Sequence, residues 1–380
     1  MSLIEFGTIM NLTKGKKPKN QFGEYKAGLM PYVDIKAFET GKIESYTDGE
    51  KCLPCKEGDI LIVCDGSRSG LVGKALNGYV GSTLAKISAE GLTQDYLYYF
   101  LQGQYALLNT KKKGTGTPHL NPELLRKQQI YVPSIETQQS IVARIEELFS
   151  ELDKGVETLQ TIKEQLAVYR QAVLKAALSM QECPTVKISD ACSEIVDCPH
   201  STPKWVDNGY LCLRTTNFKR GFLDLGEPNY VSKETFIDRN RRLVPKEGDV
   251  LYSREGSILG IACIVPKGIE LCLGQRMMLL RASGKLNNKF LMYYLNSPMV
   301  TNHVITTKGG TGSPHINVGD IKNFGIPFPK IEQQNRIVEF IEEKFSVCDS
   351  IEQTVDTALA QAEAMRQSIL KKAFEGELCK

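Results

Sequence analysis

An internal repeat constrains the fold of this 380-residue chain more than any other feature. Residues 114–178 align without a gap with residues 310–374, and 27 of the 65 aligned positions are identical. Each copy begins with a Gly-Thr-Gly-x-Pro-His-x-Asn turn and continues into a Pro-x-Ile-Glu-x-Gln segment. Repetition on this scale is typical of chains built from equivalent structural units. Because the length also exceeds that of one ordinary hydrophobic core, the sequence predicts two globular halves.

Each repeat ends in a long stretch that predicts a helix. No proline lies between Pro133 and Pro184 or after Pro329. In both stretches apolar residues recur at alternating spacings of four and three, and a 3.5-residue period sustained over several heptads is typical of a coiled coil. The predicted helix–helix seam consists of Ile141, Ile145, Leu148, Leu152, Leu159, Ile162, Leu166, Ile337, Ile341, Ile351, Val355, Met365 and Ile369.

Connectivity favours an antiparallel helix pair. Each predicted helix leaves a globular half at its N-terminal end, and the second half begins near Val186, only a few residues after the first helix. A parallel pair would require the chain to return along the whole rod, and no residues are left for that. We therefore expect antiparallel packing in a rod roughly 60 Å long, at 1.5 Å per residue. A coiled coil formed between two copies of the chain is the alternative reading.

The two halves share a scaffold whose loops differ in length. Lys-Glu-Gly-Asp opens a short apolar run at residues 56–63 and again at residues 246–252. Each run leads into a small-residue turn, Asp65-Gly66-Ser67 or Glu255-Gly256-Ser257, and a later apolar segment predicts a short buried helix. The offset between the copies grows from 190 to 196 along the chain. The frame is therefore shared, whereas the loops have diverged.

The predicted fold class is α+β. Two similar globular α/β domains are separated by two long antiparallel coiled-coil helices, and the whole forms a pseudo-twofold internal repeat. The expected boundaries are 1–133 for the first globular domain, 134–180 for the central helix, 181–329 for the second globular domain and 330–380 for the C-terminal helix.

Composition excludes several classes of protein. No run approaches the 18 or so apolar residues of a membrane span, and the N-terminus does not resemble a signal peptide, so we expect a soluble cytoplasmic protein. The 11 cysteines are then expected to be reduced thiols. Cys52 and Cys55 form a single C-x-x-C pair, and Cys192, Cys198 and His200 fit no recognised ligand pattern, so no metal site is predicted.

Charge points weakly towards nucleic acid. Residues 1–136 and 179–332 carry net charges of +3 and +4, whereas 137–178 and 333–380 carry −1 and −3. An excess this small also fits an ordinary mixed surface. Arg68 and Arg254 flank the shared turn on opposite sides, and an arginine there can reach a guanine edge or a phosphate. The predicted DNA contacts are Lys16, Lys17, Ser67, Arg68, Lys74, Lys111, Lys112, Lys113, His119, Arg214, Lys219, Arg220, Arg241, Arg242, Arg254, Ser257, Arg276, Lys308 and His315, with Lys14 and Arg239 as further basic candidates.

These features resemble the specificity (S) subunits of type I restriction–modification systems. Both halves end in the Gly-Thr-Gly turn, the Pro-x-Ile-Glu-x-Gln segment and a helix that finishes Arg-Gln-x-x-Leu-Lys. The resemblance covers essentially the whole chain. It implies two target recognition domains, each reading one half of a bipartite, gapped DNA site, with the helices as a ruler between them. One departure is that the first half lacks the tryptophan-containing entry often seen in the family, and the sole tryptophan is Trp205.

The resemblance also implies partners and cofactors. Double-stranded DNA is the expected ligand, two modification (methyltransferase) subunits are expected to dock on the helices, and a restriction subunit is expected to supply the motor and the nuclease. S-adenosylmethionine, ATP and magnesium then belong to those partners, and no cofactor is expected in this chain.

The residues themselves predict no catalytic centre. The chain contains no Pro-Pro, so it lacks the Asn/Asp-Pro-Pro-aromatic motif with which a DNA methyltransferase grips an extruded base. Gly73-Lys74 is followed by Ala75 and does not form a P-loop. The histidines of the repeated turns are interpreted as loop braces or as contacts to the DNA backbone. An autonomous enzyme that uses these histidines and a protein-binding scaffold remain the alternative hypotheses.

Overall fold

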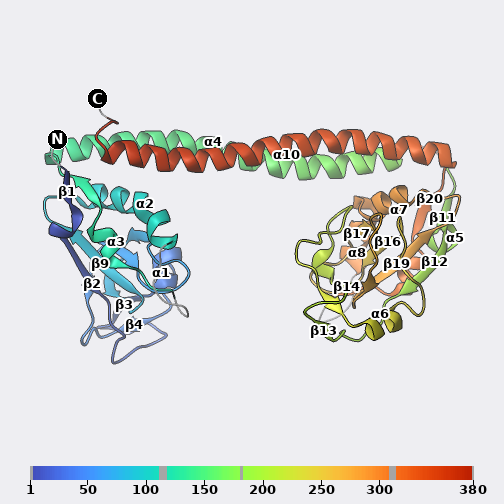
Figure 1. Ribbon diagram of the computed structural model, residues 1–380, viewed down its shortest axis with the longest axis horizontal. Coiled ribbons are helices and arrows are strands. Elements are labelled where there is room, and N and C mark those ends of the chain that lie inside the picture. Colours follow the sequence, from blue (N-terminus) through green and yellow to red (C-terminus); the bar gives the residue numbers. More distant parts are fainter. Residues whose placement is uncertain (1–2, 111–117, 180–182, 308–313, 379–380) are drawn as a thin grey trace. The chain divides into compact units, whose positions relative to one another are not determined.

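The computed structural model describes residues 3–110, 118–179, 183–307 and 314–378. The chain divides into two compact units (Figure 1). Unit 1 comprises residues 1–160 and 356–380, and unit 2 comprises residues 161–355. Helices α4 (Ile135–Ser179) and α10 (Ile331–Phe374) are each divided between the two units.

Unit 1 is built from two four-stranded sheets, a two-stranded ribbon and short helices. The central sheet has the order β2-β9-β6-β7 and is antiparallel, and the second sheet has the order β4-β3-β8-β5, in which β3 and β8 are parallel. Its elements are β1 (Leu3–Glu5), β2 (Met10–Lys14), β3 (Met30–Val33), α1 (Ile35–Thr40), β4 (Tyr46–Thr47), β5 (Pro54–Cys55), β6 (Ile60–Val63), β7 (Val72–Lys74), β8 (Gly78–Val80), β9 (Leu84–Ala89), α2 (Gln94–Thr110), α3 (Pro122–Arg126) and β10 (Gln129–Tyr131).

Unit 2 repeats this plan. Its central sheet has the order β12-β19-β16-β17, and its second sheet has the order β13-β15-β14-β18 with β14 and β18 parallel. Its elements are β11 (Thr185–Lys187), α5 (Ile188–Ala191), β12 (Cys192–Asp197), β13 (Trp205–Val206), β14 (Tyr210–Leu213), β15 (Tyr230–Val231), α6 (Lys233–Arg239), β16 (Val250–Ser253), β17 (Ala262–Ile264), β18 (Cys272–Leu273), β19 (Met277–Ala282), α7 (Asn288–Leu295), α8 (Pro298–Thr307), α9 (Val318–Lys322) and β20 (Gly325–Pro327).

The second sheets differ at their edges. The run β4-β3-β8 of unit 1 corresponds to β15-β14-β18 of unit 2, because both contain one antiparallel and one parallel pair. Unit 1 adds β5 beside β8, whereas unit 2 adds β13 beside β15 on the other edge. The diverged loops thus contribute different edge strands to an unchanged frame.

The Lys-Glu-Gly-Asp motif starts the central strand of each unit. Asp59 accepts from the Lys56 N–H at 2.9 Å, and Asp249 accepts from the Lys246 N–H at 2.7 Å. Both carboxylates are buried, and each forms an ion pair with a cation of the neighbouring strand. The cation is Lys86 in unit 1 and Arg281 in unit 2. The motif is therefore a side-chain-locked turn, in which aspartate mimics a backbone acceptor.

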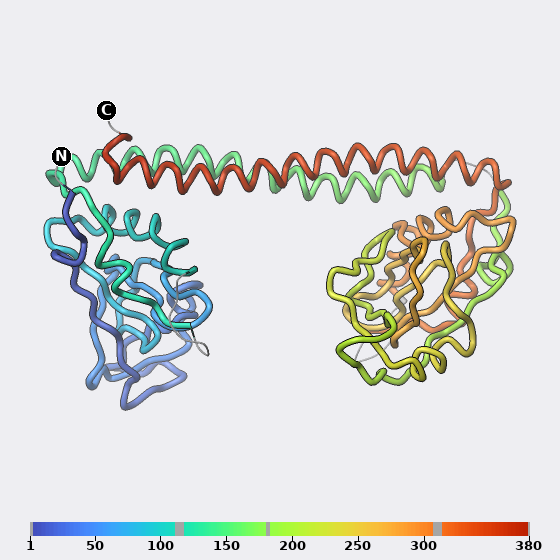
Figure 2. The backbone as a smooth tube through the Cα atoms, in the orientation of Figure 1, coloured from blue at the N-terminus to red at the C-terminus, as the bar shows by residue number. Residues whose placement is uncertain are grey.

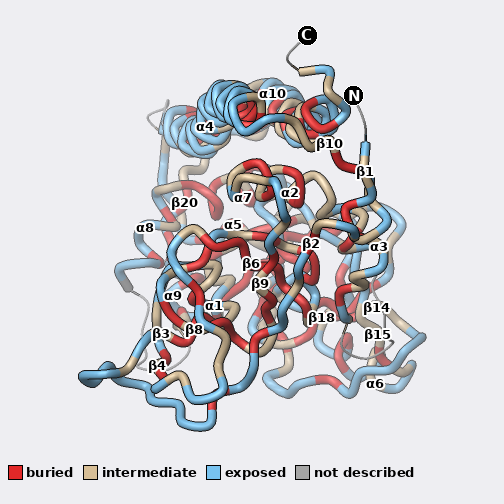
Figure 3. The backbone as a smooth tube through the Cα atoms, turned by 90° about the vertical axis from the view of Figure 1, so that its left-hand side faces the viewer, coloured by how far each residue is buried: buried red, intermediate tan, exposed pale blue. Residues whose placement is uncertain are grey.

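Each unit packs its helix α2 or α7 between the central sheet and a pair of long-helix segments, which lie side by side (Figure 2). In unit 1, Ile145 of α4 and Phe374 of α10 join the core, and the Phe374 ring lies 5.0 Å from Tyr96 and 5.4 Å from Phe100. In unit 2 the core includes Leu174 of α4. The face of the helices turned away from the units is exposed (Figure 3).

The helix segments are antiparallel within each unit, as expected, and this confirms the predicted fold class. In unit 1, Arg366 near the C-terminal end of α10 donates to Asp153 of α4, and its guanidinium lies 4.7 Å from the centre of the Phe149 ring. In unit 2, Arg170 of α4 donates to Asp349 (2.7 Å) and Glu352 (2.8 Å) of α10. The arginines occupy equivalent positions of the repeat, and so do the aspartates.

Eleven of the thirteen predicted seam residues are buried or partly buried, and two are exposed. Ile145, Leu166, Ile341 and Val355 are buried, but Ile351 and Met365 are 41% and 53% exposed. The residue that follows each of them, Glu352 after Ile351 and Arg366 after Met365, is partly buried instead. The prediction assumed that both inward heptad positions are apolar, whereas here one of them carries charged side chains whose stems cover the seam. Of the other predicted members, Ile141 is buried, and Leu148, Leu152, Leu159, Ile162, Ile337 and Ile369 are partly buried.

A buried glutamine joins each long helix to its unit. The Gln138 carboxamide accepts from the Thr93 N–H (2.8 Å) and donates to the carbonyls of Gly91 (2.7 Å) and Pro133 (3.1 Å). Gln334 makes the same three bonds, with the Asn287 N–H (2.8 Å) and the carbonyls of Lys285 (3.1 Å) and Pro329 (2.8 Å). The glutamine of the Pro-x-Ile-Glu-x-Gln segment is thus explained as a structural joint.

Candidate nucleic-acid interface

The turn after the central strand is tightly specified in unit 1. Gly66 follows β6 with a φ of 103°, in the left-handed region that glycine adopts freely. Its N–H donates to the carbonyl of Pro118 (2.9 Å), and the Leu120 N–H donates to the carbonyl of Cys64 (2.8 Å). The segment around His119 therefore crosses the turn as an antiparallel bridge and fixes its shape.

Unit 2 repeats this bridge. Gly256 has a φ of 90° and donates to the carbonyl of Pro314 (2.9 Å), and the Ile316 N–H donates to the carbonyl of Arg254 (3.0 Å). His315 forms the bridge to the turn. The repeated Pro-His segment is thus a loop brace in both units, which is one of the two roles proposed from the sequence for the paired histidines.

A carboxylate lies at the centre of the turn in unit 1. Asp65 accepts from Lys14 Nζ at 2.8 Å, and its other oxygen lies 2.8 Å from His119 Nδ1. Burial alone would raise the pKa of Asp65, but the hydrogen bonds from Lys14 and His119 outweigh burial and hold this pKa below its ordinary value. Asp65 therefore takes part in both contacts as an ionised carboxylate.

An arginine takes the central position in unit 2. Arg254 Nε and Nη2 donate to the two oxygens of Asp197 at 2.8 and 3.1 Å, and Nη1 lies 3.0 Å from Glu255. The Arg254 side chain is only 6% exposed. A bidentate, buried pair of this kind occupies the guanidinium donors. Arg254 therefore supports the loop through its ion pairs with Asp197 and Glu255.

The two networks are built on equivalent positions with opposite charges. Lys14 pairs across the sheet with Ala85, the second residue of β9, and Asp197 pairs with Met278, the second residue of β19. A cation in one unit thus stands where the other has an anion. The residue between strand and turn changes accordingly, from an uncharged cysteine in unit 1 to the arginine in unit 2. The backbone frame is kept and the polar network is reversed.

The parallel strands of the second sheet reach the same edge. The Gly81 N–H donates to the carbonyl of Val33 (2.8 Å), and the Gly274 N–H donates to that of Leu213 (3.0 Å). A Cβ at Gly81 or Gly274 would lie 2.6 or 2.2 Å from the same carbonyl oxygens, so only glycine fits. Two residues after each of these glycines, a backbone carbonyl accepts a hydrogen bond from the residue before the turn. Thr83 accepts from the Cys64 N–H, and Arg276 accepts from the Arg254 N–H. The residues that follow β3 and β14 therefore occupy equivalent places beside the turn.

A buried arginine fastens the entry segment of unit 2 to this edge. Arg239, at the end of α6, donates to the carbonyls of Leu273 and Gly274 (3.0 Å each) and to the carbonyl of Ser201. Arg239 is 7% exposed, so this basic candidate of the sequence analysis is structural. Thr202 in the same segment bonds the Gln275 side chain at 3.3 Å. Residues 200–205 thus lie along the ends of the parallel strands.

The structure brings some predicted residues together at this edge. In unit 1 the exposed Lys16 and Lys17 follow β2 directly, and Ser67 lies in the turn. In unit 2 the exposed Ser257 and Arg276 flank the turn. Arg276 lies 3.9 Å from Glu255, and Arg242 donates to the backbone carbonyl of Asp197.

Other predicted residues form ion pairs or hydrogen bonds within their own unit. Lys74 pairs with Asp95 of α2 at 2.7 Å, at the opposite end of β6, and the exposed Arg68 pairs with Glu39. In unit 2, Lys219 pairs with Asp224, Arg241 with Asp238, and Arg220 donates to the carbonyl of Asn296. Lys111, Lys112, Lys113 and Lys308 lie outside the described residues, as do the Gly-Thr-Gly parts of both turns.

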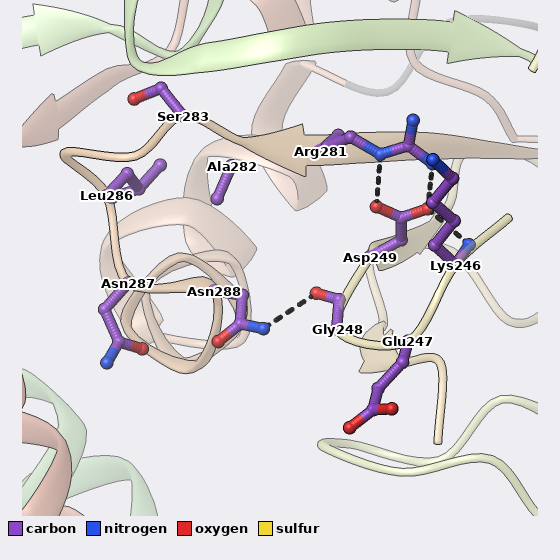
Figure 4. Close-up of a pocket in the computed structure, with 10 residues that line it drawn as sticks. All are labelled: Lys246, Glu247, Gly248, Asp249, Arg281, Ala282, Ser283, Leu286, Asn287 and Asn288. Carbon is purple, nitrogen blue, oxygen red and sulfur yellow. Dashed lines mark hydrogen bonds and ion pairs between the residues drawn. The ribbon is translucent and has the colours of Figure 1, made fainter. Parts of the chain in front are cut away.

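A pocket of about 430 Å³ lies at the other end of the central strand of unit 2 (Figure 4). Arg281 reaches Asp249 through two hydrogen bonds of 2.8 and 2.7 Å, and Asn288 donates to the carbonyl of Gly248. These bonds lock the Lys-Glu-Gly-Asp turn. The hydrogen bonds drawn in Figure 4 stabilise this turn. We therefore do not assign the pocket to the interface.

Sequence reasoning missed the acidic members of the interface. Asp65 and Glu255 stand beside the turn glycine in both copies, a signal that was visible, but only the arginines and serines were considered there. His200, considered only as a metal ligand, instead lies 3.0 Å from Asp197. Within the described ranges, no group of three or more His, Cys, Asp and Glu side chains is arranged to hold a metal ion. Nor does any helix described here have the length and apolarity needed to cross a membrane.

Comparisons with known proteins agree with this architecture. The sequence profile of the type I restriction modification DNA specificity domain matches residues 1–166 and 187–361. The chain is 26% identical over 412 aligned residues to the type I restriction enzyme EcoBI specificity subunit of Escherichia coli, covering 99% of this chain and 85% of that protein. It is 24% identical over 398 residues to the MjaVIII specificity subunit of Methanocaldococcus jannaschii, covering 99% and 92%.

A solved structure shares the fold. It comes from work on complex assembly and conformational transition of the type I restriction–modification system, and it superposes with a TM-score of 0.70 at 20% identity over 99% of this chain and 98% of that one. The profile match extends over both units, including the turns and most of both long helices. The chain therefore belongs to the type I restriction–modification DNA specificity family.

Proposed function

We propose that the chain is the DNA sequence-specificity subunit of a type I restriction–modification complex and that each unit reads one half of a gapped DNA site. The observation that carries this proposal is the edge around the Gly66 and Gly256 turns. There a similar backbone frame presents different polar side chains in the two units. A shared frame with exchanged hydrogen-bonding groups suits the reading of two different base sequences.

The long helices are proposed to set the gap and to bind partners. A helix of 45 residues is roughly 68 Å long at 1.5 Å per residue, so its length supplies a fixed spacer. In unit 2 the helices expose Val168 and Tyr169 of α4 and Val347 and Ile351 of α10, at 41–70% exposure. Apolar side chains exposed together on a helical surface are typical of a protein-binding face. We assign modification subunits to this surface.

Catalysis is proposed to reside in the partners. Members of the specificity family recognise DNA without being enzymes themselves, and the sequence contains neither a methyltransferase motif nor a P-loop. S-adenosylmethionine, ATP and magnesium would then be bound by the modification and restriction subunits. The number of modification subunits per chain is expected to be two, because the helical repeat is present twice.

A reciprocal exchange at the turn tests this proposal. Arg68 in unit 1 and Ile258 in unit 2 stand at equivalent positions after the turn serine, so Arg68→Ile and Ile258→Arg each give one unit the residue of the other. The chain, co-purified with its modification subunit, selects duplexes from a randomised pool. We expect two conserved half-sites at constant spacing for the wild type, and a change in one half-site only for each variant. A contiguous wild-type site, or changes in both halves with either variant, would contradict the proposal.

A further inference from the structure

Arg214 differs from the other arginines that the sequence placed at the DNA surface of unit 2. It follows β14 directly, at the edge shared with the turn, and is exposed. Arg254 and Arg276 lie against Glu255, and Arg242 donates to a backbone carbonyl. In the part of the chain that the structure describes, no carboxylate lies within ion-pair distance of Arg214. Its guanidinium charge is therefore available to an external anion or base.

Trp205 holds the Arg214 side chain in place. The guanidinium carbon lies 5.6 Å from the centre of the indole ring, within the range of a cation–π contact. The backbone that carries the ring is itself held, because β13 pairs with β15 and Arg239 fastens the preceding residues to the end of β18. A guanidinium laid on an aromatic face loses little further freedom when it binds. Trp205 is 38% exposed, so the pair reaches the surface.

Among the described residues of unit 1, there is no counterpart to this pair. The equivalent position after β3 is Asp34, whose carboxylate accepts from the Ala37 N–H (2.9 Å) and caps helix α1. The edge strand that carries Trp205 is found only in the second sheet of unit 2. An aspartate cannot bind the acceptor atoms of guanine or a phosphate oxygen. The two units therefore differ in base chemistry at this position.

We propose that Arg214, oriented by Trp205, reads a guanine in the half-site bound by unit 2. This inference rests on the proposed function and names one specificity-determining contact within it. A planar guanidinium can donate in parallel to O6 and N7 of guanine in the major groove, and this bidentate pair discriminates against other bases. A lysine could hold a phosphate at the same place but could not reproduce the paired geometry.

The experiment measures discrimination base pair by base pair. The complex of full-length chain and modification subunit is titrated with its selected duplex and with duplexes that carry one substitution at each specified position. The variants are Arg214→Ala, Arg214→Lys and Trp205→Ala. Lys267→Ala is the control, because it removes one exposed positive charge of unit 2 at the opposite end of the central strand from Arg254.

For the wild type we expect one G·C pair in one half-site whose substitution weakens binding roughly 5- to 150-fold. Arg214→Ala and Arg214→Lys should reduce that ratio to below twofold at this pair alone, Trp205→Ala should reduce it in part, and Lys267→Ala should leave it unchanged. Intact discrimination at the remaining positions of the half-site bound by unit 2 shows that unit 2 is folded in each variant.

Three results would overturn the inference. These are an unchanged ratio in Arg214→Ala, an equal loss of affinity at every position, which would indicate a phosphate contact, and full retention of the ratio in Arg214→Lys. Failure of the proposed function looks different, because the wild-type complex would then select no gapped site at all.

Discussion

The glutamine joint at the start of each long helix gives a quantitative test of how the units are built. Gln334→Leu keeps the side-chain volume nearly constant and removes three hydrogen bonds of 2.8 to 3.1 Å from a site with no solvent exposure. Each such bond contributes about 1 kcal/mol net, so we expect the free energy of unfolding of unit 2 to fall by roughly 3 kcal/mol. That corresponds to about a hundredfold in the ratio of folded to unfolded unit.

The repeat supplies a matched variant. Gln138→Leu removes the same three bonds in unit 1 and should cost unit 1 a similar free energy. Because the two glutamines share no partner, the losses in a double variant should add to within about 0.5 kcal/mol. Gln334→Glu keeps the acceptor for the Asn287 N–H but turns a carboxylate oxygen towards two carbonyls. Its folded-state pKa should therefore be raised, and its destabilisation should shrink as the pH is lowered towards that pKa.

Urea unfolding provides the assay. Trp205 is the sole tryptophan, so its fluorescence follows unit 2, while hydrogen exchange in α2 follows unit 1. A loss below about 1 kcal/mol in both leucine variants would refute the assignment of the glutamines as buried joints. So would a Gln334→Glu chain whose destabilisation is independent of pH between 5 and 8, on the order of the range in which a buried carboxyl titrates.

Three further predictions concern the turn and the seam. Gly66→Ala should destabilise unit 1 by about 1–2 kcal/mol in a urea titration, because φ is 103° there, whereas Gly284→Ala, at a glycine with open space around it, should cost less than half as much. Arg366→Ala should cost about 1 kcal/mol, mostly through the lost stacking on Phe149, and full retention of stability in Arg366→Lys would argue against that stacking. The pKa of Asp65 is depressed, so its stabilisation is present above its unfolded pKa of about 4 and disappears as the pH falls through the lower folded value. Wild type and Asp65→Asn should therefore differ in stability at pH 6 and converge under acid, and a constant difference down to pH 2 (about two units below the ordinary Asp pKa) would contradict this.

The large-scale fold was predictable because its signals are repeated and periodic. The duplicated Gly-Thr-Gly turn, the proline-free stretches and the 3.5-residue period each appear twice, and they led to two α/β units with antiparallel helices. The exact inward positions were not predictable from apolar residues alone. Glu352 and Arg366 of α10 point inward because each pairs with an oppositely charged residue of α4, Arg170 or Asp153. A pattern of apolar residues does not reveal such ion pairs.

The interface was predictable as a region but not residue by residue. The Gly66 and Gly256 turns were identified, since small residues between two apolar runs mark a turn. Which arginine faces solvent depends on tertiary partners that are distant in sequence: Arg254 is buried by Asp197, which lies 57 residues away. Arg214 and Trp205 come together only because β13, β15 and β14 form one sheet. Contacts of that kind become visible only in three dimensions.

A genome-wide map of modified bases tests most directly whether the two units of this chain recognise two different DNA half-sites. The map is made in cells that co-express this chain with its modification subunit, and compared with cells that express the modification subunit alone. The account predicts that every chain-dependent modified base lies in a single motif with two specified parts separated by a constant number of unspecified base pairs. Modification at a contiguous motif, or modification without any motif, would contradict it.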